Sequence, residues 1–204
     1  MVRDGLPFVF VPLLAACLAA AFGLWYVALP LLLLTGFMAY FFRDPRRAVL
    51  TDASIVVSPA DGRVTRVAQI EPGTAHTGTV VSIFLSPFDV HINRAPVAGE
   101  ITDVTYQKGR FVIATREDAS LVNEQNALTI KGEHVTVICK QIAGVLARRI
   151  VCWKHAGERV ALGERFGLIK FSSRTDLILP PEVEVTVRVG DRVRGGTSLI
   201  GRVR

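Results

Sequence analysis

The stretch VEVTVRVGDRVRGG, residues 183–196, decides how the larger part of the chain folds. Valines alternate with charged or hydroxyl side chains over residues 183–189, the period-two pattern of a β-strand with one buried face. The Gly-Asp pair at 190–191 and the Gly pair at 195–196 then interrupt the pattern, as turn residues do between neighbouring strands. Such closely spaced turns are typical of a β-rich domain with short connections.

Short runs of the same kind recur throughout the chain after residue 50. No stretch there shows a long 3.6-residue apolar period, so long amphipathic helices are not expected. The domain is predicted to be mainly β. The predicted strands are residues 55–58, 63–70, 79–85, 100–106, 127–131, 134–142, 147–153 and 183–189.

Two pairs of segments are weakly similar in sequence. PADGRVTRV (59–67) is similar to PVAGEITDV (96–104), and GERVALG (157–163) is similar to GDRVRGG (190–196). The two spacings differ, so the chain is not a solenoid. The second pair resembles the tight turn G-[DE]-x-V-x-x-G of biotinyl/lipoyl-like domains. That resemblance implies a compact β-sandwich of the barrel-sandwich-hybrid type, built from related halves.

Composition limits the class of protein. The chain has 204 residues, of which 50% are hydrophobic and 21% charged, which excludes a disordered or low-complexity protein. The net charge of +6 is compatible with nucleic acid, anionic lipid or no specific partner. Cys17, Cys139 and Cys152 form no C-x-x-C pair, which argues against a disulfide scaffold or structural zinc site and favours a reducing compartment.

Residues 5–42 contain no charged side chain, unlike the core helix of a soluble protein. A single helix over residues 8–42 would be roughly 52 Å long, beyond the ~30 Å hydrocarbon core of a bilayer. Gly23, with Trp25 and Tyr26 beside it, indicates a break at an interface. We predict an N-terminal α-helical membrane hairpin, spanning or re-entrant, with a cleaved signal peptide as the weaker alternative.

Basic residues flank this segment on both sides. Arg3 precedes it and three arginines within residues 43–47 follow it, so the positive-inside rule places both ends in the cytoplasm. We therefore predict two parts: residues 1–50, the membrane hairpin and basic flank, and residues 51–204, a β domain. The predicted location is the cytoplasmic side of the cell (inner) membrane.

Two polar stretches are candidates for chemistry. The four histidines have no spacing such as H-x-H or H-E-x-x-H, so a metal site is not expected. His91 differs from the others because Asp, His, Asn and Arg crowd together over residues 89–94, just after an apolar strand. The second stretch, residues 163–176, joins a strand to a Ser-Ser pair, whose spacing alone carries little information.

Four motifs in matching order resemble one family. They are FFRDPR (41–46), SPADGRV (58–64), FLSPFDVHINRAP (84–96) and RFGLIKFSSR (165–174). Together they resemble phosphatidylserine decarboxylases of the short bacterial and archaeal form. The motifs extend over most of the chain, and an apolar N-terminal segment also fits that family.

The resemblance implies a proenzyme that cuts itself at a Gly-Ser bond and converts the Ser into a pyruvoyl group. The matching residue here is Ser173, preceded by Ser172 where the family has Gly. Cleavage at Ser172-Ser173 would give a β chain of residues 1–172 and an α chain of residues 173–204. The pyruvoyl group derived from Ser173, with no metal, would form a Schiff base with the substrate amine.

The same resemblance implies roles for three further residues. The family's processing relay of Asp, His and Ser maps onto Asp61, His91 and Ser173. His91 is also the candidate general acid that protonates the carbanion after CO2 departs. Arg94 stands where longer relatives have a second His; it is either a contact for the substrate phosphate or carboxylate or a solvated or structural arginine.

The expected function is the conversion of phosphatidylserine to phosphatidylethanolamine and CO2, in a carboxy-lyase whose partners are phospholipid, the membrane and its own α and β chains. A homo-oligomer is left open. The alternative is a noncatalytic membrane-anchored barrel-sandwich adaptor or carrier, although no Met-flanked Lys typical of carriers is present. A metallopeptidase would need ligand spacings that are absent. Nucleic acid is not expected, because basic residues are spread along strands without aromatic interleaving.

Overall fold

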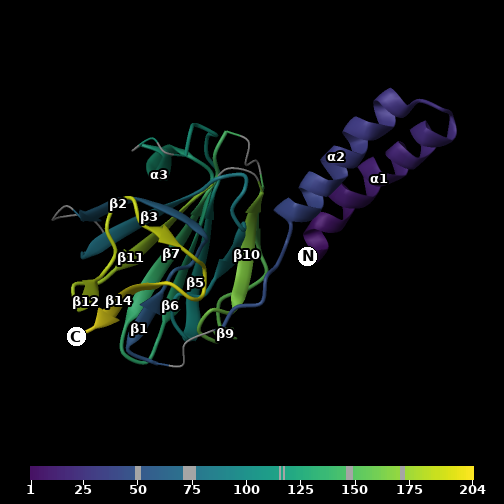
Figure 1. Ribbon diagram of the computed structural model, residues 1–204. Coiled ribbons are helices and arrows are strands. Elements are labelled where there is room, and N and C mark those ends of the chain that lie inside the picture. The colour runs from purple at the N-terminus through teal and green to yellow at the C-terminus, as the bar shows by residue number, and fades with distance from the viewer. Residues whose placement is uncertain (49–51, 71–76, 115, 117, 146–148, 171–172) are drawn as a thin grey trace. The chain divides into compact units, whose positions relative to one another are not determined.

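The computed structural model describes residues 1–48, 52–70, 77–114, 116, 118–145, 149–170 and 173–204. It divides the chain into two compact units, Met1–Arg46 and Arg47–Arg204. We call them the hairpin unit and the β unit and describe each by itself (Figure 1).

The hairpin unit consists of two apolar helices, α1 (Leu6–Ala21) and α2 (Trp25–Phe41), preceded by a 3-10 turn at Arg3–Gly5. Gly23 separates the helices with φ of 73°, a left-handed conformation that favours glycine. The helices lie side by side, so the predicted break at Gly23 is confirmed (Figure 1). The amide of Val2 donates to the carbonyl of Phe42 at 3.2 Å, which brings the two ends of the hairpin together.

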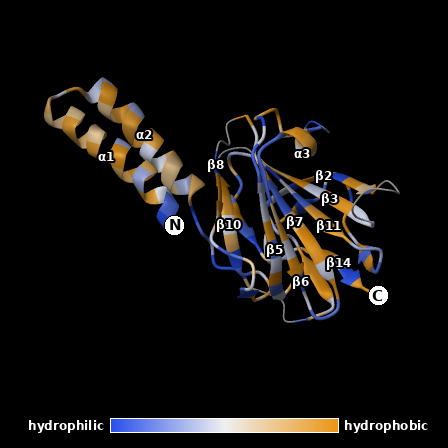
Figure 2. Cartoon of the chain, turned by 180° about the vertical axis from the view of Figure 1, so that it is seen from behind, coloured by the Kyte–Doolittle hydropathy of each residue, from blue (hydrophilic) through white to orange (hydrophobic). Residues whose placement is uncertain are grey.

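Hydrophobic residues predominate in this hairpin (Figure 2), and many of its large apolar side chains are exposed. Arg3–Ala21 is long and apolar enough to cross a membrane, and Trp25–Phe41 is a shorter apolar helix. Such an apolar surface is solvated poorly by water and well by lipid. The most exposed large side chains are Phe10, Val11, Leu14, Leu18, Phe22, Trp25, Tyr26, Leu29 and Leu33.

The β unit confirms the mainly β prediction, and among the described residues every pairing between two named strands is antiparallel. An eight-stranded sheet has the order β13-β2-β3-β11-β7-β6-β5-β9, and two three-stranded sheets have the orders β4-β10-β8 and β1-β14-β12. The strands are β1 Ile55–Val57, β2 Gly62–Gln69, β3 Thr79–Leu85, β4 Ile92–Arg94, β5 Gly99–Gln107, β6 Gln125–Lys131, β7 Thr136–Ile142, β8 Arg149–Cys152, β9 Arg159–Val160, β10 Arg165–Lys170, β11 Ser173–Leu179, β12 Val183–Val185, β13 Arg192–Val193 and β14 Leu199–Val203; a short helix, α3, covers Ala119–Val122.

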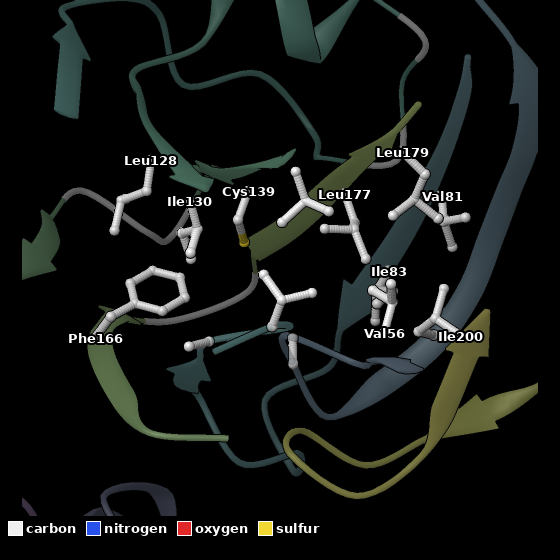
Figure 3. Packing of buried hydrophobic residues seen from close by; sticks show 14 of the residues in the cluster. Val56, Val81, Ile83, Leu128, Ile130, Cys139, Phe166, Leu177, Leu179 and Ile200 are labelled. Carbon is white, nitrogen blue, oxygen red and sulfur yellow. The ribbon is translucent and has the colours of Figure 1, made fainter. Parts of the chain in front are cut away.

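The hydrophobic core fills the space inside the curved large sheet. Phe166 of β10 packs toward Leu128 and Ile130 of β6, while Val56 of β1 and Ile200 of β14 pack toward β3 and β11 (Figure 3). The two small sheets thus cover one face of the large sheet, which makes a sandwich. Cys139 lies within this core, and burial raises the pKa of its thiol, so it is not a reactive thiolate.

Six strands begin or end at the same end of the large sheet, and we call this end the Ser173 edge. Across neighbouring strands, Gln107 pairs with Gln125, Gln125 with Ile142, Ile142 with Arg174, and Arg174 with Phe84. Strands β3, β5 and β7 therefore end at this edge, and β2, β6 and β11 begin there. Residues that follow or precede these strands share one end of the β unit.

The predicted strand 183–189 is too long. Strand β12 ends at Val185, and the chain then turns so that the amide of Gly190 donates to the carbonyl of Val64 at 2.8 Å. Val183 and Val185 therefore belong to β12, whereas Val187 and Val189 lie in the connection that follows it. Only the first part belongs to the three-stranded sheet that contains β14.

Candidate active site

Ser173 is the first residue of β11 and pairs with Leu85 of β3 at the Ser173 edge. Its side chain is fully buried, and its Oγ has no hydrogen-bond partner within the described part of the chain. A buried hydroxyl left unpaired costs about 1–3 kcal/mol, so such groups are rare and point to function. Ser172, the other residue of the predicted cleavage site, lies outside the described residues.

His91 lies between β3 and β4 and is 1% exposed. Its Nδ1 is 3.0 Å from the carbonyl oxygen of Asp89. A carbonyl only accepts hydrogen bonds, so we assign the hydrogen to Nδ1, which leaves the lone pair of a neutral ring on Nε2. Nε2 is then the atom that can take up a proton. The amide of Ile169 donates to the His91 carbonyl at 3.2 Å, which extends the β4–β10 pairing to His91.

Asn93 joins the strand that follows His91 to the strand that begins at Ser173. Its Nδ2 donates to Thr175 Oγ1 at 3.0 Å, and its Oδ1 accepts from Gln141 Nε2 at 2.9 Å. Side chains two residues apart on extended backbone point to the same side. The contact between Asn93 and Thr175 therefore indicates that His91 and Ser173 face the same space between the sheets.

The hydrogen bonds continue from Gln141 to Asn126, whose Nδ2 donates to Gln141 Oε1 at 3.0 Å. Asn93, Gln141 and Asn126 are all buried, and a buried polar network of this kind holds its members in one arrangement. Gln141 was not among the site residues predicted from the sequence. The signal was available, because Val137, Cys139 and Gln141 occupy successive inward positions of one strand.

Asp61 is held by Arg47 and by the backbone of Gly195. Its Oδ2 accepts from Arg47 Nη2 at 2.6 Å and its Oδ1 from the amide of Gly195 at 2.8 Å. Burial raises the pKa of the Asp61 carboxyl, and the Gly195 hydrogen bond and the Arg47 charge offset part of that rise. The Asn93–Thr175 hydrogen bond joins the strand after His91 to the strand that begins at Ser173, and Asp61 lies near Asp89, whose charge also raises the Asp61 pKa.

Arg94 is 6% exposed, and its Nη1 donates to the carbonyl of Gly163 at 3.0 Å. Its backbone amide donates to Pro59 at 2.9 Å. A Cβ at Gly196, where φ is 77°, would lie 2.9 Å from Arg94 Cδ, so the absence of a side chain there leaves room for the arginine. Arg94 therefore contacts the loops of Pro59, Gly163 and Gly196 inside the fold.

Arg174 and Asp176 form a two-point ion pair directly after Ser173, with both N–O distances at 2.8 Å. Both side chains are buried, at 4% exposure each. Arg174 Nη1 also donates to the carbonyls of Ala114 and Arg116, at 3.2 and 3.0 Å. The residue after Ser173 thus fixes the segment between β5 and β6 over the Ser173 edge.

A cavity of about 530 Å³ lies beside this site. Asp89, whose carbonyl orients His91, and Asp61 both line it, so it is a candidate approach for a polar headgroup. A second cavity, of about 890 Å³, includes Glu100, Lys131 and Glu133 at the opposite end of the β5–β6 hairpin. Within the described residues, no group of three or more His, Cys, Asp or Glu side chains could hold a metal ion.

The fold and these side chains define a mainly β protein with a polar site built inside a sandwich and an apolar helical hairpin at the N-terminus. The family model for phosphatidylserine decarboxylase matches residues 34–201. The chain is 51% identical over 193 residues to a phosphatidylserine decarboxylase proenzyme of Solibacter usitatus, with 93% of this chain and 92% of that protein covered. It is 43% identical to the proenzyme of Nitrosomonas eutropha, covering 99% and 94%, and 47% identical to that of Symbiobacterium thermophilum, covering 98% and 94%. The chain belongs to the phosphatidylserine decarboxylase family.

Proposed function

We propose that this chain decarboxylates phosphatidylserine to phosphatidylethanolamine, using a pyruvoyl group that it makes from Ser173. The observation that carries the proposal is the buried hydroxyl of Ser173, which has no hydrogen-bond partner among the described residues and lies on a strand that Asn93 joins to the strand after His91. The proenzyme names of the relatives support processing into two chains. The residues at the site fit a pyruvoyl group, because the Ser173 hydroxyl from which that group would form lies at the start of β11, a strand held between two others.

Self-cleavage would begin with attack of Ser173 Oγ on the carbonyl carbon of Ser172. His91 Nε2 takes the hydroxyl proton and returns it to the departing backbone nitrogen, which leaves an ester in place of the peptide bond. β-Elimination then releases residues 1–172 with a new carboxylate. The dehydroalanine left at position 173 takes up water and loses ammonia to become the pyruvoyl group.

In the decarboxylation step, the pyruvoyl group supplies an electrophilic carbonyl that withdraws electrons as CO2 leaves. The protein residues must bind the headgroup, exclude water and deliver one proton to the carbon that lost CO2. His91 is suited to that last role because the Asp89 carbonyl holds Nδ1 and directs Nε2 away from it. Asp61 and Arg94 are proposed to support processing and substrate binding, respectively.

The two chains would stay together after cleavage. Strand β11 lies between β3 and β7 and pairs with both, so residues 173–204 remain inside the large sheet. The Gly195 amide, in the α chain, also donates to Asp61 in the β chain. The α and β chains are therefore each other's partners through many backbone contacts.

The hairpin unit is proposed to hold the enzyme on the cytoplasmic face of the inner membrane, close to its phospholipid substrate. The contact between Val2 and Phe42 supports placing both flanking basic segments on one side. The apolar exposed surface of α1 and α2 supports contact with lipid.

Intact mass of purified protein tests the processing step. Wild-type chain should separate into fragments of residues 1–172 and 173–204, and the second should resist Edman degradation because a pyruvoyl group has no amine. Ser173→Ala should remain one chain and lose all decarboxylation. Ser82→Ala is the matched control, since Ser82 on β3 is also fully buried with an unpartnered Oγ, and it should still be cut. Full activity of Ser173→Ala would overturn the pyruvoyl mechanism.

A further inference from the structure

Exposed apolar side chains of the β unit gather at the Ser173 edge. The described residues of this unit include six large hydrophobic side chains that are strongly exposed, and five of them lie at this edge. Soluble surfaces seldom collect such side chains in one place without a partner. The five are Phe88 (66% exposed), Tyr106 (52%), Ile113 (57%), Leu121 (75%) and Val145 (46%).

Strand topology explains why these residues share one end. Phe88 follows the end of β3, and Val145 follows the end of β7. Ile113 and Leu121 belong to the connection between β5 and β6, which leaves and re-enters the sheet at the edge. Figure 1 shows α3, which carries Leu121, at that end of the β unit, and Figure 2 shows it as hydrophobic.

Hydrogen bonds hold these segments in place, so the exposure is a property of the fold. Arg174 donates to the carbonyl of Ala114, next to Ile113. Asn123 Nδ2 donates to the carbonyls of Val112 at 2.9 Å and Ala143 at 2.8 Å, and its Oδ1 accepts from the Val112 amide at 2.9 Å. The segment of Ile113 is thereby tied to the segment of Val145.

Basic side chains flank the apolar ones. Lys108 and Arg110 follow β5, Arg63 pairs with Phe84 at the start of β2, and Arg149 pairs with Lys170 at the end of the small sheet. All four are exposed, and within the described residues none of the four forms an ion pair. Exposed hydrophobic side chains ringed by Lys and Arg are the pattern of proteins that lie in the interface of an anionic bilayer.

We propose that the Ser173 edge of the β unit docks on an anionic bilayer, with Phe88, Ile113, Leu121 and Val145 among the lipid headgroups. The inference rests on the proposed function, because the headgroup must reach Ser173 while the acyl chains stay in the membrane. The hairpin supplies proximity to the membrane, and the Ser173 edge supplies the orientation. Burial of apolar area and attraction of the flanking basic residues to acidic lipids both favour this orientation.

A label that reports its surroundings tests the docking without using activity. Full-length protein carrying Leu121→Cys in a Cys17→Ser background is labelled with an environment-sensitive fluorophore and placed in vesicles of phosphatidylcholine and phosphatidylglycerol. Ala98→Cys is the matched control, because Ala98 is exposed at the opposite end of the large sheet. The parent Cys17→Ser chain gives the background from Cys152.

The label at position 121 should shift its emission to the blue and be quenched by brominated lipid, while the label at position 98 should behave as in water. Equal quenching at the two positions would overturn the proposal. A blue shift at position 121 that increases with protein concentration, without quenching by brominated lipid, would also overturn the proposal. A second copy of the chain would then cover the edge. Because no turnover is measured, this result stands even if the chain has no decarboxylase activity.

A pair of charge reversals gives a second test. Lys108 and Lys131 lie at opposite ends of the β5–β6 hairpin, and both are exposed. Lys108→Glu should raise KM for phosphatidylserine in anionic vesicles by about fivefold to thirtyfold, the effect expected for one to two charges at such a surface. Lys131→Glu should not change it, and both variants should match wild type on short-chain phosphatidylserine in solution. An equal change in KM for both variants would refute docking by the Ser173 edge.

Discussion

Replacing Asn93 by Ala should destabilise the fold and slow self-cleavage together. Asn93 donates to Thr175 at 3.0 Å and accepts from Gln141 at 2.9 Å, and all three side chains are fully buried. The variant strands the Gln141 amide donor, which costs about 1–3 kcal/mol, and losing the bond to Thr175 adds about 1 kcal/mol. We expect a loss of about 2–4 kcal/mol, a large fraction of the stability of an ordinary domain.

Urea unfolding measures this loss most clearly in a Ser173→Ala background, where the chain stays in one piece. Thr102→Ala is the matched control, because Thr102 donates at 3.4 Å to a backbone carbonyl at an exposed position, and it should cost less than about 0.5 kcal/mol. Adding Gln141→Ala to Asn93→Ala removes the stranded donor, so the double variant should lose less than the sum of the single losses.

The positioning role of Asn93 is tested by processing. With Ser173 restored, Asn93→Ala should be cut at least about tenfold more slowly than wild type, since tenfold corresponds to ~1.4 kcal/mol in a barrier that depends on the approach of His91 to Ser173. A gel time course after synthesis follows the two fragments. If Asn93→Ala is cut at the wild-type rate and loses less than about 0.5 kcal/mol of stability, the Asn93 hydrogen bonds do not align His91 with Ser173.

Three further predictions concern charge and topology. Burial raises the pKa of Asp61, so the folded chain holds this proton more tightly than the unfolded chain and the carboxyl destabilises the fold as pH rises from its ordinary pKa to the raised one. Asp61→Asn should remove that fall from pH-dependent urea midpoints, and an unchanged slope would contradict it. Arg174→Met leaves Asp176 buried without its ion pair, so urea unfolding should show a loss of about 3–5 kcal/mol; a loss under 1 kcal/mol would contradict the pair's importance. Arg3→Cys and Arg43→Cys should react with an impermeant maleimide from the same side of the membrane, and labelling from opposite sides would exclude the hairpin.

Some elements could be predicted from the sequence because their burial is one-sided. Residues 134–142 alternate in sequence and the structure places β7 there with alternating burial, while β5 covers the predicted strand 100–106 although a register irregularity between Ile101 and Asp103 interrupts its alternation. The two helices of the hairpin could also be predicted from the sequence. An uncharged segment that would be longer as one helix than the bilayer is thick needs a break, and Gly23 is placed to supply it.

Strand β11 could not be predicted by the same rule. Six of its seven residues are buried, including Ser173, Arg174 and Asp176, so no alternation survives in the sequence. Arg174 and Asp176 are tolerated there because each satisfies the other, and Arg174 also donates to two backbone carbonyls. Only the structure shows which partners make such charges acceptable inside a sheet.

The sequence indicated candidate residues for the site, but it did not indicate the contacts that connect them. The cluster at 89–94 marked His91, and the motif match marked Ser173, but neither indicates that Asn93 links their strands or that the Asp89 carbonyl orients the imidazole. Those contacts join residues that are far apart along the chain, as Asn93 and Thr175 are, and they depend on how one sheet packs over another. A single sequence carries little information about such packing.

The position of Ser173 at the start of β11 connects the fold to the proposed processing. Strand β11 pairs with β3 from Ser173 onward and with β7 from Arg174 onward. A cut on the N-terminal side of Ser173 would therefore leave the β11 pairings from Arg174 onward intact. The new terminus stays fixed by the sheet on one side and by the Arg174–Asp176 pair directly after it. A chain built in this way can break its backbone at the nucleophile without losing the arrangement that the later decarboxylation requires.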